Sequence, residues 1–278
     1  CFPSLLYTCA LMVIIFGTTF ITVPLIHSHV TNEDAEFLTT FQLVKGVFGI
    51  IVMLVIWLCV VLRYKLAVKI LNKMVDIDNE MSVLQDLYYL ETSKRRISIL
   101  FAANYILWIM IIVIELTTTE ESWGIWIPLM LPDIIMNGYI MQYILILIMM
   151  ENRFMSVNHS FIMISKSRIE AFLHSDIRPT DISERMILNN FIILKRAHSI
   201  FCEICRDISD YYAFPILPTI AFQCGAIIYN CYNLLVPVVV HNGGEHTLLQ
   251  ITKMICWVLM EILPILALSV CVTRVLNE

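Results

Sequence analysis

The sequence predicts an all-α membrane protein, and composition, hydropathy and the placement of charge support this class. Of the 278 residues, 59% are hydrophobic and 15% are charged, whereas a soluble domain carries about 25% charged residues. The mean hydropathy is +0.80. These values exclude a soluble enzyme, a disordered chain and a nucleic-acid-binding protein. The most direct interpretation is a multi-span membrane protein, in which lipid replaces water as the solvent for most side chains.

Six apolar stretches are long enough to cross the hydrocarbon core, which takes about 20 residues of helix. They cover residues 5–26, 41–62, 97–116, 126–150, 214–240 and 251–272. Pro128 and Pro132 lie near the start of the fourth stretch, and Pro215 and Pro218 lie near the start of the fifth. These helices are therefore expected to tilt or kink. The chain starts at Cys1 and enters the first stretch with no basic segment before it. We therefore expect a truncated chain or part of a longer one.

Basic residues predict the orientation of these helices. The connections 63–96 and 151–213 hold 15 of the 18 Lys and Arg residues, and Arg274 follows the last stretch. The connections 27–40, 117–125 and 241–250 hold none. The positive-inside rule then places both basic connections and both chain ends in the cytoplasm. This orientation is opposite to that of a rhodopsin-like receptor.

The cytoplasmic connections are predicted to be helical extensions of the spans. Asp181 and Glu184 have the spacing of a capping box at a helix start. No Pro or Gly interrupts the chain from Ile182 to the fifth span, and residues 151–173 can continue the fourth span. We expect residues 63–96 and 151–213 to form a cytoplasmic helical anchor within a single transmembrane domain covering residues 1–278.

The sequence contains no catalytic signature. It has no phosphate-binding Gly loop, no H-E-x-x-H and no G-x-S-x-G. Cys202 and Cys205 form a lone C-x-x-C without a second pair or a histidine at ligand spacing. The protein is therefore predicted not to be an enzyme, and no cofactor or metal is predicted.

Polar and charged residues inside the spans carry the functional signal. Each costs about 2.5–3.5 kcal/mol or more near the bilayer centre, so each is expected to face a partner or water. Helical spacing places them on one face of each span. The groups are Asn104, Trp108 and Glu115; Trp126, Met130, Asp133 and Asn137; Gln223, Asn230 and Asn233, with Tyr229 and Tyr232 alongside; and Lys253, Trp257 and Glu261.

All four groups lie largely in the outer half of their spans, which predicts an outward-opening pocket for a small polar or amphipathic ligand. The alternative is plain interhelical bonding, with Lys253 neutralising Glu261 or Asp133. Trp123, Trp126 and Trp257 also suit a membrane-interface belt. The candidate ligand-binding residues are Trp108, Glu115, Trp126, Asp133, Asn137, Gln223, Tyr229, Asn230, Tyr232, Lys253, Trp257 and Glu261.

Five segments resemble those of the insect gustatory receptors, which belong to the inverted seven-helix chemoreceptor family. Four of them lie near the predicted cytoplasmic end of a span. The other is the aromatic segment near the outer end of the fifth span. The five segments are Glu151-Asn152-Arg153-Phe154-Met155-Ser156-Val157-Asn158; the run from Cys202-Phe-Glu-Cys205 to Tyr212; Ile228-Tyr229-Asn230-Cys231-Tyr232-Asn233-Leu234; the residues from Cys271 to Glu278; and Ile70-Leu71-Asn72-Lys73-Met74-Val75-Asp76-Ile77-Asp78.

The resemblance implies a ligand-gated, nonselective cation channel in the plasma membrane. It implies a tetramer, either a homotetramer or a hetero-oligomer with other receptor subunits. Each subunit would bind a tastant (a sugar, a bitter compound or another polar or aromatic molecule) among its first six helices, and the seventh helices would line one pore. The family's Thr-Tyr…Gln-Phe signature of that helix is absent from this chain, so six of the seven expected helices are predicted here.

Two other functions remain open at this level. An odorant receptor-like subunit would share the fold but have a more apolar pocket, which Asp133, Lys253 and Glu261 disfavour. A secondary transporter would show inverted repeats and broken, Gly-rich helices in two matching halves. The sequence has only eight glycines and shows no such repeat.

Overall fold

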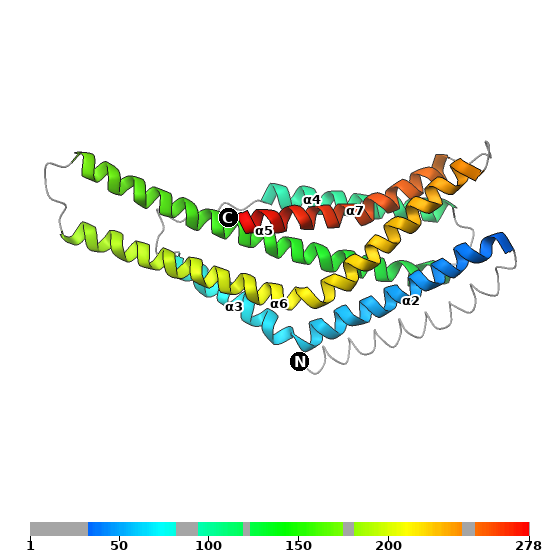
Figure 1. Ribbon diagram of the computed structural model, residues 1–278, viewed down its shortest axis with the longest axis horizontal. Helices are drawn as coiled ribbons and strands as arrows, with labels where there is room; N and C mark the ends of the chain where they lie inside the picture. Colours follow the sequence, from blue (N-terminus) through cyan, green and yellow to red (C-terminus); the bar gives the residue numbers. More distant parts are fainter. Residues whose placement is uncertain (1–32, 82–93, 119–122, 175–180, 241–247, 278) are drawn as a thin grey trace. The chain divides into compact units, whose positions relative to one another are not determined.

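The computed structural model describes residues 33–81, 94–118, 123–174, 181–240 and 248–277 (Figure 1). Within these ranges every regular element is an α-helix, which confirms the predicted all-α class. The helices are α2 (Glu33–Leu62), α3 (Tyr64–Met81), α4 (Lys94–Thr118), α5 (Trp123–His174), α6 (Asp181–Val240) and α7 (Leu248–Asn277). The first predicted span, residues 5–26, lies outside the described residues.

Five of these helices are long and apolar enough to cross a membrane, counted over the described residues. The candidate spans are Val44–Leu62, Arg95–Thr117, Met130–Lys166, Ile187–Leu235 and Ile251–Asn277. They overlap the second to sixth stretches predicted from the sequence. The chain is therefore an all-α, multi-pass membrane protein.

Two helices are much longer than a bilayer crossing requires. Helix α5 has 52 residues and α6 has 60. At a rise of about 1.5 Å per residue, their axes are about 78 Å and 90 Å long. The hydrocarbon core is about 30 Å thick, so both helices continue beyond it. Helix α6 begins at Asp181, as the capping-box spacing predicts, and runs without a break into the fifth span. The predicted continuity of both helices is confirmed.

The chain divides into two compact units. Unit 1 comprises Cys1–Leu62, Leu100–Met141 and Phe214–Leu266. Its described core includes a cluster between α4 and α7, with Trp108 and Ile111 packed near Met260. A second cluster joins Ile50 and Met53 of α2 to apolar residues of α5. Its outward-facing side chains are strongly apolar, for example Leu217 at 72% and Ile228 at 69% exposure, as expected of helices surrounded by lipid.

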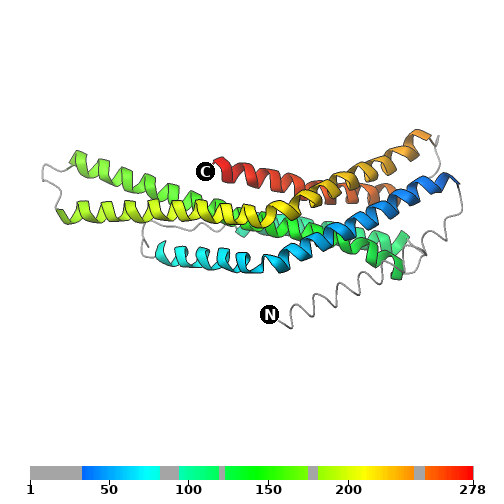
Figure 2. The same ribbon diagram turned by 60° about the horizontal axis from the view of Figure 1, so that its bottom comes forward.

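Unit 2 comprises Arg63–Ile99, Gln142–Ala213 and Ala267–Glu278. Within it, the later part of α5 and the earlier part of α6 run side by side in opposite directions (Figures 1 and 2). Aromatic contacts mark the antiparallel register. The ring centroids of Tyr143 and Tyr212 lie 4.4 Å apart, and those of Phe154 and Phe201 lie 5.9 Å apart.

Helix α3 of unit 2 is amphipathic, unlike the membrane spans. Its buried residues are Ile70, Met74, Ile77 and Met81, which recur at helical spacing, while its other faces carry charge. This pattern is typical of a helix that packs on one side and meets water on the other. It agrees with the prediction of helical structure after the second span.

Candidate functional site: a charged and aromatic cavity in unit 1

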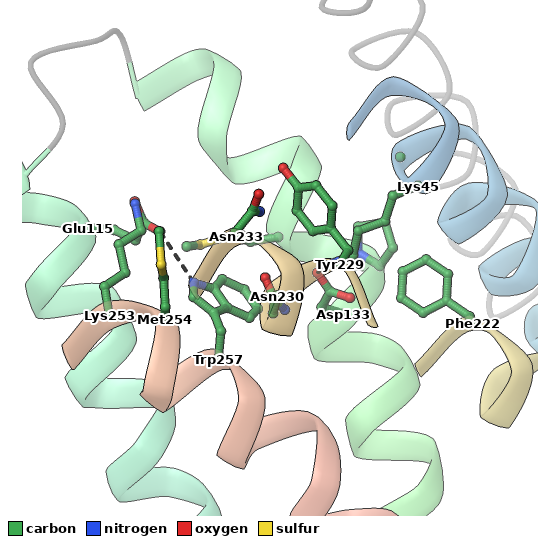
Figure 3. A pocket seen from close by; sticks show the side chains of 13 residues that line it. Lys45, Glu115, Asp133, Phe222, Tyr229, Asn230, Asn233, Lys253, Met254 and Trp257 are labelled. Carbon is green, nitrogen blue, oxygen red and sulfur yellow. Dashed lines mark hydrogen bonds and ion pairs between the residues drawn. The ribbon is translucent and has the colours of Figure 1, made fainter. Parts of the chain in front are cut away.

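A cavity of about 220 Å³ lies among five helices of unit 1 (Figure 3). Its volume is somewhat below the range of about 300–1,000 Å³ that is usual for drug-sized ligands, so it suits a small molecule. Charged, amide and aromatic side chains from separate helices meet there. The lining residues are Lys45 and Gly46 of α2; Glu115 of α4; Met130, Pro132 and Asp133 of α5; Phe222, Tyr229, Asn230 and Asn233 of α6; and Lys253, Met254 and Trp257 of α7.

Lys45 is central to one half of this site. Its Nζ lies 3.6 Å from Asp133 Oδ2 and 3.6 Å from Glu261 Oε1. The same Nζ lies 5.7 Å from the centroid of the Phe222 ring and 5.5 Å from that of Trp257. In Figure 3 these two rings lie on either side of the Asp133 carboxylate. The Lys45 ammonium is thus surrounded by two carboxylates and two aromatic faces, both of which attract a cation.

Asn230 fixes the second of these carboxylates. Its Nδ2 donates to both oxygens of Glu261, at 3.0 and 3.1 Å. Both side chains are buried, with 9% of Asn230 and 5% of Glu261 exposed. A carboxylate held in this way keeps its orientation and its capacity to accept from a cation. Nearby, Asn137 Nδ2 donates to the backbone oxygen of Met260 at 3.5 Å.

A second ion pair forms the other half of the site. Lys253 Nζ donates to Glu115 Oε2 at 2.8 Å, and Trp257 Nε1 donates to Glu115 Oε1 at 3.4 Å. The Trp257 ring meets Trp108 edge to face at 6.1 Å. The expected pairing of Lys253 with Glu261 or Asp133 is corrected, since these acids pair with Lys45. Lys253 and Glu261 are eight residues apart on α7, about 12 Å along the axis.

The cavity brings together half of the candidate residues from the sequence: Glu115, Asp133, Tyr229, Asn230, Lys253 and Trp257. Trp108 and Glu261 contact lining residues without lining the cavity, and Asn137 packs beside Glu261 through Met260. Gln223 is buried but does not line it, and Tyr232 is 46% exposed. Trp126 lies where the structure describes only the backbone.

Sequence reasoning missed Lys45 and Phe222 as cavity residues. The signal for Lys45 was available, because it is a single charge just inside an apolar span. Phe222 carried no such signal, since an aromatic residue in a membrane helix faces lipid or protein equally well. Its role depends on stacking with Phe48, whose ring centroid lies 6.1 Å away.

Unit 2 has its own charge network, which links its helices. Arg153 is 6% exposed, and its Nε donates to Asp78 Oδ1 at 3.0 Å. Glu151 is 4% exposed and accepts from Arg96 Nη1 at 3.0 Å, with Arg274 Nη1 at 3.6 Å. These ion pairs join α5 to α3, α4 and α7 within unit 2.

Lys73 joins α3 to α6 within unit 2. Its Nζ donates to Glu203 Oε1 at 2.8 Å and to Asp207 Oδ2 at 3.0 Å. These two hydrogen bonds raise the pKa of Lys73 above its usual value. Lys73 therefore stays charged at physiological pH and keeps this link in place.

The C-x-x-C of α6 shows no metal-site geometry. Cys202 is exposed, and its Sγ lies 3.8 Å from His198 Nδ1. Across the residues that the structure describes, no three His, Cys, Asp or Glu side chains come close enough to hold a metal. The charged cavity of unit 1 is thus the strongest candidate for function.

The described helices form a helical membrane protein, and its cavity combines charged, amide and aromatic groups. The family model for the 7tm chemosensory receptors matches residues 1–278. The chain therefore belongs to the 7tm chemosensory receptor family. No curated protein and no solved structure matches the chain. Family membership indicates a chemoreceptor that lies in a membrane and binds small chemical ligands.

Proposed function

We propose that this protein is a gustatory receptor that acts as a ligand-gated, nonselective cation channel and binds a small tastant in an outer pocket among its helices. The observation that carries the proposal is the cavity of unit 1, in a chain of the chemosensory receptor family. Charged, amide and indole groups from separate helices converge there, so a small polar tastant can be recognised by several groups at once. The candidates Glu115, Asp133, Tyr229, Asn230, Lys253 and Trp257 are the first contacts in this proposal.

We propose that unit 2 is the cytoplasmic anchor and that the cavity opens toward the outside. The distribution of charge supports this: 16 of the 18 Lys and Arg residues fall within the ranges of unit 2, and only Lys45 and Lys253 fall in unit 1. The positive-inside rule assigns such a basic unit to the cytoplasm. In this proposal both ends of the chain are cytoplasmic, with residues 5–26 as the first span, and the receptor is in the plasma membrane.

The proposed mechanism is a shift in the balance between closed and open states. A ligand can shift that balance only by binding the two states with different affinity. Five helices contribute to the cavity, so a ligand that draws them together changes their packing. In this proposal ligand binding favours the open state of the channel, and the receptor is a homotetramer or a hetero-oligomer with other receptor subunits.

The main alternative is an odorant receptor-like subunit. Three ion pairs and a buried Asn–Glu contact at the cavity disfavour a purely apolar, volatile ligand, because such a ligand would desolvate these groups without pairing them. A secondary transporter ranks lower, because nothing beyond a central polar site supports it.

The test uses the full-length receptor, expressed in cells that report cation entry, with a panel of sugars, bitter compounds, amines and nucleosides. The variants are Asp133→Asn and Glu261→Gln, which remove charge and nearly preserve shape. We expect half-maximal concentrations for an active compound to rise at least about tenfold, because one charge-assisted hydrogen bond contributes about 1.5–3 kcal/mol. Surface expression should persist.

Glu203→Gln is the matched control, since it removes the same charge from an ion pair in unit 2. Its dose–response curve should match that of the unchanged receptor. Unchanged curves for both cavity variants would remove these carboxylates from the ligand site.

A further inference from the structure

We propose that the cavity recognises small alkylammonium ions, and that Lys45 occupies the ammonium position as a tethered competitor. This rests on the proposed function only in placing the ligand in the cavity. Four side chains, called here the ammonium cage, surround the Lys45 ammonium: Asp133, Glu261, Phe222 and Trp257. Carboxylates and aromatic faces together are the surroundings that proteins use to bind organic cations.

The fit between Lys45 and the cage is loose. Both carboxylate oxygens lie 3.6 Å from its Nζ, longer than the 2.7–3.2 Å usual for a hydrogen bond from nitrogen to oxygen. The other lysine of the cavity, Lys253, lies 2.8 Å from its carboxylate. The cage thus holds the Lys45 ammonium by charge and leaves room for a cation that carries alkyl groups.

The charge balance of the cavity also favours a cation. Among the described residues, three carboxylates, those of Glu115, Asp133 and Glu261, share the ammonium groups of Lys45 and Lys253. Counted formally, with every carboxylate ionised, these five groups carry one net negative charge. Glu261 keeps its orientation through the two hydrogen bonds from Asn230, so it stays available to an incoming cation.

The Lys45 ammonium can reach the membrane surface when a ligand displaces it from the cage. Lys45 is the fifth residue of the span predicted over residues 41–62, and its side chain is 18% exposed. A lysine near the end of a span can extend its ammonium to the membrane surface. The exchange is therefore one cation for another, with Lys45 still protonated and the cage still neutralised.

A tethered competitor lowers the apparent affinity for the free ligand. A group on a short flexible tether acts at an effective concentration on the order of millimolar. Removing the Lys45 ammonium should therefore tighten ammonium binding, whereas removing a pairing lysine elsewhere should not. This sign is opposite to that expected if Lys45 is a purely structural partner of Asp133 and Glu261.

The test measures binding of butylammonium to the purified full-length receptor by thermal shift, with 1-butanol as the neutral probe of similar size. Lys45→Met is the variant. Lys73→Met is the matched control, since Lys73 also lies between two carboxylates but outside the cavity. We expect butylammonium to bind Lys45→Met at least tenfold more tightly than the unchanged receptor. Lys73→Met should show no gain, and 1-butanol should not discriminate.

A second variant isolates the cage itself. Lys45→Met with Asp133→Asn removes one cation and one anion, so the charge balance is preserved, and the gain in butylammonium binding should disappear. Where Lys45→Met folds poorly because two carboxylates lose their counter-ion, butylammonium added during expression should restore its yield and 1-butanol should not. No gain in binding, an equal gain in Lys73→Met, or no selective rescue would overturn the proposal.

The outcome separates this proposal from the proposed channel function. Cation currents that depend on Asp133 and Glu261 for a neutral tastant, with no ammonium gain in Lys45→Met, would overturn the ammonium cage alone. Selective butylammonium binding without any ligand-evoked current would support the cage and contradict the channel.

Discussion

At the scale of single residues, Glu115 and Lys253 form the ion pair of the cavity that lies outside the ammonium cage, with 2.8 Å between Lys253 Nζ and Glu115 Oε2. The Glu115 side chain is 8% exposed and that of Lys253 is 24% exposed. Removing one partner leaves the other charge buried without its counter-ion, which costs more than removing both. Glu115→Gln and Lys253→Gln should therefore each lower the thermal stability of the purified receptor.

The double variant should lose less stability than the two single variants added together. The coupling between residues in one ion pair is about 0.5–3 kcal/mol. Thermal unfolding of the four proteins in one detergent measures it. Strict additivity would mean that the pair contributes nothing in the folded receptor.

The sequence predicted which residues gather at the site better than it predicted their partners. Helical spacing aligned Lys253, Trp257 and Glu261 on one face of the sixth span, and the structure places all three at or beside the cavity. Pairing was not predictable in the same way, because Glu115 and Lys253 lie on different helices whose contact is set by packing. A lone lysine such as Lys45 signals that a partner exists but does not identify it.

At the scale of helices, α2 approaches α5 and α6 closely at Gly49. A Cβ at this position would lie 3.1 Å from Phe222 Cε2 and 3.2 Å from Pro132 Cβ. Both neighbours line the cavity. Gly49→Ala should therefore push α2 away or displace Phe222, with a cost of about 1–3 kcal/mol for overpacking, and should alter the ligand response.

Gly225→Ala is the control within a helix of the same unit. Nothing lies within 4 Å of a Cβ at Gly225, and alanine favours helix by about 0.8–1.0 kcal/mol over glycine. Its thermal stability should be unchanged or higher. A Gly49→Ala receptor as stable as Gly225→Ala would contradict the close packing of α2.

The continuity of the long helices was predictable because it depends on local sequence. The absence of Pro and Gly between Ile182 and the fifth span allowed one helix, and α6 has it. The prolines at the start of that span do not end the helix, which continues through Pro215 and Pro218 to Val240. Thr219 Oγ1 donates to the carbonyl oxygen of Pro215 at 2.7 Å.

At the scale of the whole molecule, the proposed orientation puts the part of α6 that belongs to unit 2, up to Ala213, in the cytoplasm. Cys202 is an exposed thiol there. A membrane-impermeant maleimide should label it only after cells are permeabilised, with Cys202→Ser as the reference for specificity. In intact cells the same reagent should label Ser28→Cys in the predicted outer connection. Labelling of Cys202 in intact cells would reverse the orientation.

The division of the chain into two units was not predictable from hydropathy alone. Helices α5 and α6 each continue from one unit into the other. The charge distribution is the sequence signal that follows this division, since 16 of 18 basic residues fall in unit 2.

The central claim is that ligand binds in the cavity of unit 1, and cysteine protection tests it most directly. Asn233 lines the cavity, so a thiol-reactive reagent should modify Asn233→Cys in the full-length receptor more slowly when an activating ligand is present. Modification of Cys202 in permeabilised cells serves as the internal control and should be unaffected. Protection at Asn233→Cys alone is the predicted result; equal modification rates with and without a saturating ligand would contradict the account.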